Sequence, residues 1–349
     1  MKQTNFFLHI SKIILFSGIL VATASARAEL KVVTTIKPLH SLISNVMDGV
    51  GEPGLIIDGS ISPHSFTMKP SHAKMLEEAD VIFWIGEGIE TSMEEPLDSI
   101  AKDAEVIEFM ELDSIAKLKF REESIFGDHD DHDDHDDHDD HDDHDDHDDH
   151  DDHDDHDDHD DHDDHDNHDD HDDHAGHEGH NHGEFDAHIW LDPSNAKEMV
   201  HEIAHELGDL DPANKDKYEA NAEATIKALD QLISDVGTDI NSDAKFVVFH
   251  DAYQYFEERF GVRAAGALTL NTDVLPGAKQ IADIQDVIKD KGIKCIFSEP
   301  QFNPKIITTI AEDMNIKTGV FDPLGANIDP GKSLYFKLIS NLGNELKGC

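Results

Sequence analysis

The segment of residues 201–206 reads HEIAHE and contains the motif H-E-x-x-H. On a helix, this spacing places two histidines on one face, where they can hold zinc, with the glutamate as the general base of a metalloprotease. The chain has 27 histidines, so short matches of this kind arise easily. At 100° per residue, His201 and His205 fall opposite the apolar stripe of their helix and face solvent. We therefore favour two exposed helix histidines over a protease site. The stripe consists of Ala196, Met199, Val200, Ile203 and Leu207.

Four other residues lie in loops that follow apolar strand patterns or precede a helix start: His64, His188, His250 and Asp322. Open α/β sheets bind ligands in such loops, beyond the carboxyl ends of their strands. Neutral imidazoles together with a carboxylate or water form a tetrahedral, zinc-like ligand set. Taken singly, each histidine is more often a helix cap or a satisfied polar residue than a ligand, and spacing alone does not settle the choice.

Residues 128–174 repeat the unit H-D-D and hold 30 aspartates and 16 histidines. The repeat has no apolar residue that could build a core, so we expect a disordered loop over residues 128–183. Its imidazoles and carboxylates suit borderline divalent ions, and we predict several weak, exchangeable zinc sites. A solvating spacer without a metal role is the alternative.

The net charge of −51 comes largely from this repeat, because 48 acidic and 27 basic residues remain without it. No basic stripe suggests nucleic-acid binding. Residues 1–28 have the pattern of a secretory signal peptide, with a short apolar run and an A-x-A cleavage site at Ala26–Ala28. The run is about half as long as a membrane span requires, so we expect no membrane insertion. Outside the cytoplasm, Cys295 and Cys349 either form a disulfide or remain as two thiols.

Strand and helix patterns alternate on both sides of the repeat, which predicts an α/β fold with parallel sheets. Between the two alternating regions lie two helix patterns, which begin at Asp192-Pro193 and Asp211-Pro212. The second helix runs to about Ile240 and would span roughly 40 Å. We therefore expect an N-terminal α/β lobe over residues 29–211, a linking helix over 212–241 and a C-terminal α/β lobe over 242–349.

Several motifs occur in order along nearly the whole mature chain. With them the chain resembles the periplasmic zinc-binding proteins of ABC importers, a metal-specific group of substrate-binding proteins. The acidic histidine loop also matches the zinc members of this group. The motifs are T-I-K-P-L (35–39), S-P-H-S-F-T-M-K-P-S (62–71), H-I-W-L-D-P (188–193), F-H-D-A-Y-Q-Y-F (249–256), S-E-P-Q-F (298–302) and D-P-L-G-A-N-I (322–328).

The resemblance implies two Rossmann-like lobes joined by a long rigid helix, with one tight metal site between them. His64, His188 and His250 would bind the metal, and Asp322 or water would take the fourth position. Manganese and iron relatives have a glutamate at the third position, so His250 favours zinc, which suits imidazole better than manganese does. The resemblance further implies a disulfide between the two cysteines.

The function implied is that of a non-enzymatic, monomeric protein that captures Zn²⁺ in the periplasm and delivers it to an ABC permease and its ATPase subunit. The loop of residues 128–183 would gather or sense zinc. The alternatives are an extracytoplasmic zinc buffer or storage protein, an H-E-x-x-H metalloprotease, and manganese as the cargo.

Overall fold

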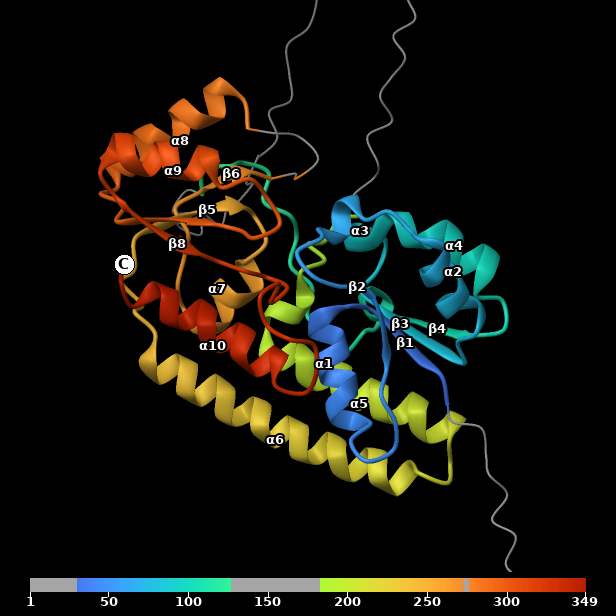
Figure 1. Cartoon of the computed structure of the whole chain (residues 1–349). Coiled ribbons are helices and arrows are strands. Elements are labelled where there is room, and N and C mark those ends of the chain that lie inside the picture. Colours follow the sequence, from blue (N-terminus) through green and yellow to red (C-terminus); the bar gives the residue numbers. More distant parts are fainter. Residues whose placement is uncertain (1–29, 127–182, 271, 273–275) are drawn as a thin grey trace, which may run out of the picture.

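A computed structural model describes residues 30–126, 183–270, 272 and 276–349 of the chain. The predicted signal peptide and the H-D-D repeat lie outside the described residues. The described residues form two α/β lobes that lie side by side above one long helix (Figure 1). The predicted fold class is confirmed.

The N-terminal lobe contains a parallel four-stranded sheet of order β2-β1-β3-β4. The central strands are buried along their whole length, as the continuous apolar runs in the sequence predict. The strands are β1 (Val32–Ile36), β2 (Gly54–Ile57), β3 (Val81–Trp84) and β4 (Glu105–Glu108), and the helices are α1 (Lys37–Val46), α2 (Pro70–Glu77), α3 (Glu87–Glu90) and α4 (Glu94–Ile100).

The C-terminal lobe repeats this arrangement with a parallel sheet of order β6-β5-β7-β8. A disulfide joins Cys295, the first residue of β7, to Cys349, which confirms the implied pairing. The strands are β5 (Phe246–His250), β6 (Ala267–Thr269), β7 (Cys295–Ser298) and β8 (Lys317–Val320), and the helices are α7 (Gln254–Phe260), α8 (Ala278–Asp290), α9 (Lys305–Met314) and α10 (Leu334–Leu346).

Two helices connect the lobes. Helix α5 (Pro193–Leu210) begins as predicted, because Asp192 Oδ1 accepts a hydrogen bond from the Ser194 amide at 2.7 Å. The predicted start of the second helix was three residues too early, since α6 (Lys215–Asp239) begins after a turn. Asp211, the C-cap residue of α5, accepts hydrogen bonds from Asn214 Nδ2 and Tyr218 Oη at this turn instead of forming the N-cap of α6. Helix α6 contacts α1 and α5 on one side and α10 on the other, so it runs under both lobes (Figure 1).

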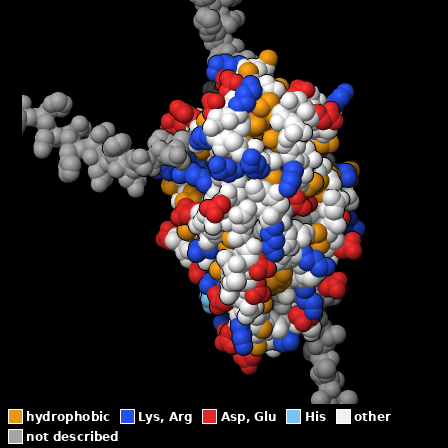
Figure 2. Space-filling view, turned by 90° about the vertical axis from the view of Figure 1, so that its left-hand side faces the viewer, with side chains coloured by type: hydrophobic (Ala, Val, Ile, Leu, Met, Phe, Trp, Pro, Cys, Tyr) orange, Lys and Arg blue, Asp and Glu red, His pale blue; other side chains and the backbone are white. Residues whose placement is uncertain are grey.

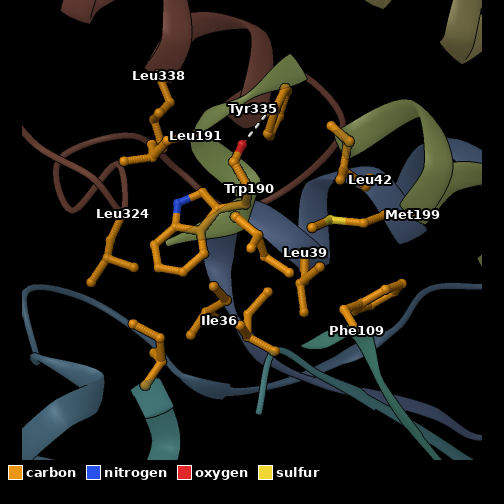
Figure 3. Packing of buried hydrophobic residues seen from close by; sticks show 14 of the residues in the cluster. Ile36, Leu39, Leu42, Phe109, Trp190, Leu191, Met199, Leu324, Tyr335 and Leu338 are labelled. Atoms are coloured by element: carbon orange, nitrogen blue, oxygen red, sulfur yellow. Dashed lines mark hydrogen bonds between the residues drawn. The ribbon is translucent and has the colours of Figure 1, made fainter. Parts of the chain in front are cut away.

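A shared hydrophobic core connects the lobes around Trp190. Its ring packs among side chains from both halves of the chain, including Leu39 and Leu324 (Figure 3). Trp190 Nε1 donates to the Pro323 carbonyl at 2.8 Å, and Tyr335 Oη donates to the Trp190 carbonyl at 2.7 Å. The lobes are therefore joined by packing as well as by α6.

The surface of the C-terminal lobe has a row of Lys and Arg side chains on the face that lies to the left in Figure 1 (Figure 2). Exposed Lys245, Lys294 and Lys317 lie at the amino ends of β5, β7 and β8. Ligand sites of parallel sheets lie at the opposite, carboxyl ends. Across the part of the chain that is described, no helix is long and apolar enough to cross a membrane.

Candidate metal centre

Three predicted ligands meet between the lobes at the carboxyl ends of the two sheets. His250 is the last residue of β5, and His64 lies in the short 3-10 helix Pro63–Ser65 that follows β2. His188 directly precedes the 3-10 helix Ile189–Leu191, which leads into α5. One ligand nitrogen from each ring lies within 4.8 Å of the others, and within the described ranges this is the group that could hold a metal ion.

The spacing of the imidazole nitrogens fits zinc. His188 Nε2 and His250 Nε2 are 3.4 Å apart. Two nitrogens bound to a tetrahedral zinc at about 2.0–2.1 Å are separated by about 3.3–3.4 Å, because the tetrahedral angle fixes the ratio of the two distances. These two rings therefore need little movement to bind one ion.

Buried carboxylates orient both of these rings. His188 Nδ1 lies 2.6 Å from Asp186 Oδ1, and His250 Nδ1 lies 2.6 Å from Glu299 Oε1. A carboxylate accepts a hydrogen bond from Nδ1–H, which leaves the Nε2 lone pair for a metal. Burial, the largest single effect, lowers the pKa of His250, but the charge and hydrogen bond of Glu299, together with the charges of Asp251 and Asp186, outweigh burial and raise it. Two lone pairs that face each other repel, so the pair is stabilised by a cation between them.

Asp322 directly precedes Pro323 and Leu324, which line the centre, but it lies outside this group of ligand atoms. Its carboxylate accepts hydrogen bonds from Gln301 Nε2 and from the amides of Leu324, Gly325 and Ala326, at distances between 2.6 and 3.2 Å. These bonds stabilise the turn at the start of the D-P-L-G-A-N-I motif. The structure thus brings three of the four predicted site residues together.

The centre adjoins a large cavity on one side, called here the open side, and a tightly packed region on the other, called here the closed side. A cavity of about 290 Å³ adjoins the three histidines and is lined by α3 and by loops of both lobes, including Phe120, Arg121 and Leu270. On the closed side, Trp190, Pro323 and Leu324 leave a space of only about 10 Å³. A solvent molecule can therefore reach the fourth coordination position from one direction.

Arg121 fixes the rim of the open side. Its guanidinium donates to Asp251 Oδ1 at 2.8 Å and to Glu257 Oε2 at 2.6 Å, and it lies 4.1 Å above the ring of Phe126. Burial raises the pKa of Asp251 to about 7, although the charge of Arg121 opposes this shift. The segment that leads toward the H-D-D repeat is thereby anchored beside His250.

The roles of Asp186, Glu299 and Arg121 were not predicted from the sequence. A usable signal existed for Glu299, because it directly follows β7, which pairs with the strand that ends at His250. The prediction for the H-E-x-x-H helix is confirmed: His201 and His205 are exposed, and Ile203 and Leu207 are fully buried.

Two parallel α/β lobes, a connecting helix and an imidazole cluster between the lobes are typical of a substrate-binding protein whose ligand is a metal ion. Residues 32–349 match the family described as Zinc-uptake complex component A periplasmic, ZnuA. The chain belongs to this family, whose members are not enzymes, so the metalloprotease alternative is excluded. The predicted family resemblance is confirmed.

Known relatives match over nearly their full length. The chain is 48% identical over 320 residues to the high-affinity zinc uptake system protein ZnuA of Brucella abortus (strain 2308), covering 91% of both chains. It is 37% identical over 344 residues to the protein of the same name from Paracoccus denitrificans, covering 97% and 98%. A crystal structure of ZnuA aligns with a TM-score of 0.64 at 20% identity, covering 90% of this chain and 98% of the other, which shows the fold alone.

Proposed function

We propose that the chain captures Zn²⁺ in the periplasm at His64, His188 and His250 and delivers it to an ABC permease driven by an ATPase subunit. The observation that carries this proposal is the 3.4 Å separation of two Nε2 atoms whose rings are oriented by buried carboxylates. The names of the relatives support zinc as the cargo. Manganese prefers oxygen ligands, so three imidazoles favour zinc over manganese.

Capture requires little movement of the two buried rings. A hydrated ion enters through the 290 Å³ cavity, exchanges water for three imidazoles and retains one water at the fourth position. We assign the fourth position to water because the oxygens of Asp322 accept bonds from the turn amides. The resemblance to metal-binding relatives leaves Asp322 as the alternative ligand.

Delivery requires the centre to open. We propose that docking of a monomer on the permease moves the sheet of the N-terminal lobe (29–211), with His64, relative to the C-terminal lobe (242–349). The His188 segment stays bonded to the C-terminal lobe through Gln254 and Tyr255, and α6 (Lys215–Asp239) limits the movement. The loop of residues 128–183 would supply weaker zinc sites that gather or sense the ion before it reaches the core site.

The test counts tightly bound zinc in mature protein that lacks residues 128–182 and carries His201→Ala and His205→Ala. Titration against a competing chelator should find one tight zinc, which a further His250→Ala substitution abolishes. A protein without tight zinc would overturn the proposed site.

The extracytoplasmic zinc buffer remains a second candidate because the repeat alone holds 16 histidines. Cells that express the chain without residues 128–182 distinguish the two functions. High-affinity zinc uptake by these cells supports the transport role, and its loss with an intact core site supports the buffer.

A further inference from the structure

Lys37 connects the lobes through a buried ammonium group. It is the first residue of α1, at the carboxyl end of β1, and its side chain is 3% exposed. Its Nζ atom donates to the carbonyls of Gly325, Ala326 and Ile328 at 2.8, 3.0 and 2.7 Å. All three acceptors lie between β8 and α10 in the C-terminal lobe. The three hydrogens of an ammonium group can satisfy these three carbonyls, so each bond is charge-assisted.

The segment that Lys37 binds forms the floor of the metal centre. Pro323 and Leu324 line the closed side, next to the three histidines. The two buried ligand segments also bind this floor: Trp190 Nε1 donates to the Pro323 carbonyl at 2.8 Å, and Tyr253 Oη donates to the Phe321 carbonyl at 3.1 Å. The position of residues 321–328 is thus linked to the segments that carry His188 and His250.

Lys37 also lies beside the segment that carries the third ligand. Its Nζ atom is 4.0 Å from Asp58 Oδ1, in the loop between β2 and the 3-10 helix of His64. Burial lowers the pKa of Lys37, and the charges of Asp58, Asp322 and Asp329 oppose that shift. The side chain of Lys37, from the N-terminal lobe, therefore lies between the loop that leads to His64 and the floor beneath all three ligands.

We infer that Lys37 is a positioning residue that keeps the floor closed beneath the bound zinc, so that its three bonds must break before zinc is released on the closed side. This inference rests on the proposed function. Separation of the lobes would withdraw the carbonyls of residues 325–328 from Nζ and move Pro323 and Leu324 away from the histidines. Without these three bonds, we expect zinc to dissociate faster while all three imidazoles remain available.

The experiment measures the rate at which the zinc-loaded mature chain releases zinc to excess chelator by stopped flow. We expect Lys37→Met to bind one zinc and to release it about 10–100-fold faster, the size of effect seen when support outside the ligand set is lost. Urea unfolding of the metal-free variants separates loss of stability from loss of positioning.

Two control variants are matched to Lys37→Met: one also loses a lysine, and the other also loses stability. Lys332→Met removes an exposed lysine whose Nζ atom lies 2.8 Å from Asp48 Oδ1, across the same boundary between the lobes. This variant should change the rate of zinc release less than twofold. Val236→Ala makes a cavity where α6 packs against α10, and should destabilise the chain without changing the release rate.

If Lys37→Met does not fold, Lys37→Gln replaces it. Glutamine keeps two N–H donors but is shorter and uncharged, so this variant should fold and still release zinc faster than the wild type. A wild-type rate in the folded variant, or equal acceleration by Val236→Ala, overturns the role of Lys37. A wild-type chain that binds no tight zinc overturns the proposed function itself.

Discussion

Replacing Asp322 by asparagine distinguishes a residue that holds a turn from a residue that binds zinc. The carboxylate accepts four hydrogen bonds, and Oδ2 receives the Ala326 amide at 2.6 Å. An asparagine that keeps the Oδ1 contacts must direct its NH₂ group at the Ala326 N–H, so two donors face each other. Loss of one hydrogen bond to a charged group costs about 1.5–3 kcal/mol. We therefore expect the free energy of unfolding of the metal-free protein to fall by about 2–3 kcal/mol.

The expected effect on zinc is small by comparison. Structural zinc sites bind with about 10–16 kcal/mol, so each of four ligands contributes roughly 3 kcal/mol, or a hundredfold or more in Kd. Because Asp322 lies outside the ligand group, Asp322→Asn should change the Kd for zinc by less than about tenfold. The matched variant His64→Ala removes a proposed ligand and should raise the Kd at least a hundredfold.

Chelator competition at pH 7 measures the Kd of both variants, and urea unfolding measures their stability. The reasoning is refuted if Asp322→Asn weakens zinc binding as strongly as His64→Ala does while the stability of the metal-free protein stays unchanged. That result would make Asp322 the fourth ligand and would displace the water we assign there.

Three further predictions follow from buried charges. Asp186→Asn weakens the orientation of His188 and should raise the Kd for zinc about 10–100-fold by chelator competition; an unchanged Kd contradicts the orienting role. Glu90 is fully buried, and burial raises its pKa from 4.5 to about 7. Its stabilising contribution is therefore complete below pH 4.5 and is lost as the pH rises through 7, a loss of up to about 3 kcal/mol. Glu90→Gln should flatten the dependence of urea unfolding on pH between 5 and 8, and equal slopes in both proteins contradict the assignment. Arg121→Met leaves two buried carboxylates without their cation and should lower the free energy of unfolding by about 3–5 kcal/mol. The control Lys279→Met, with a side chain 90% exposed, should change it by less than about 0.5 kcal/mol, and equal losses in the two variants would exclude the buried ion pairs as the cause.

The alternation of strands and helices predicted the fold because each element carries a local signal. The start of α5 is an example, since an aspartate followed by proline both caps and begins a helix. The same two residue types at Asp211-Pro212 misled, because Asp211 Oδ2 instead accepts hydrogen bonds from Asn214 Nδ2 and Tyr218 Oη, three and seven residues further along, in a turn. Local patterns do not record which hydroxyl group will lie nearby, so the start of α6 could not be placed to the residue.

The candidate site was only partly accessible from local patterns. Strand ends indicated His64 and His250, and the resemblance to known metal-binding proteins completed the set. Glu299 lies 49 residues from His250, and their contact depends on the pairing of β5 with β7. A prediction from the sequence that included the strand order would place both residues at the same edge of the sheet. Arg121 gave no comparable signal, because its partners lie about 130 residues away in another lobe.

The three histidines are not held equally. Helix α7 directly follows the His250 segment, and its first residues bind the segment of His188: Gln254 Nε2 donates to Asp186 Oδ2 at 2.7 Å, and Tyr255 Oη donates to the Asp186 carbonyl at 2.6 Å. His188 and His250 therefore keep their separation within one bonded unit, although they lie 62 residues apart. His64 follows a strand of the other sheet and is only half-buried. In the release step that we propose, movement of that sheet would change the distance from His64 to the pair without changing the pair itself. Opening of the lobes would then convert a three-imidazole site into a two-imidazole site. A tetrahedral zinc would lose one ligand in that step, which would allow a site with preset nitrogens to bind tightly and still release its ion.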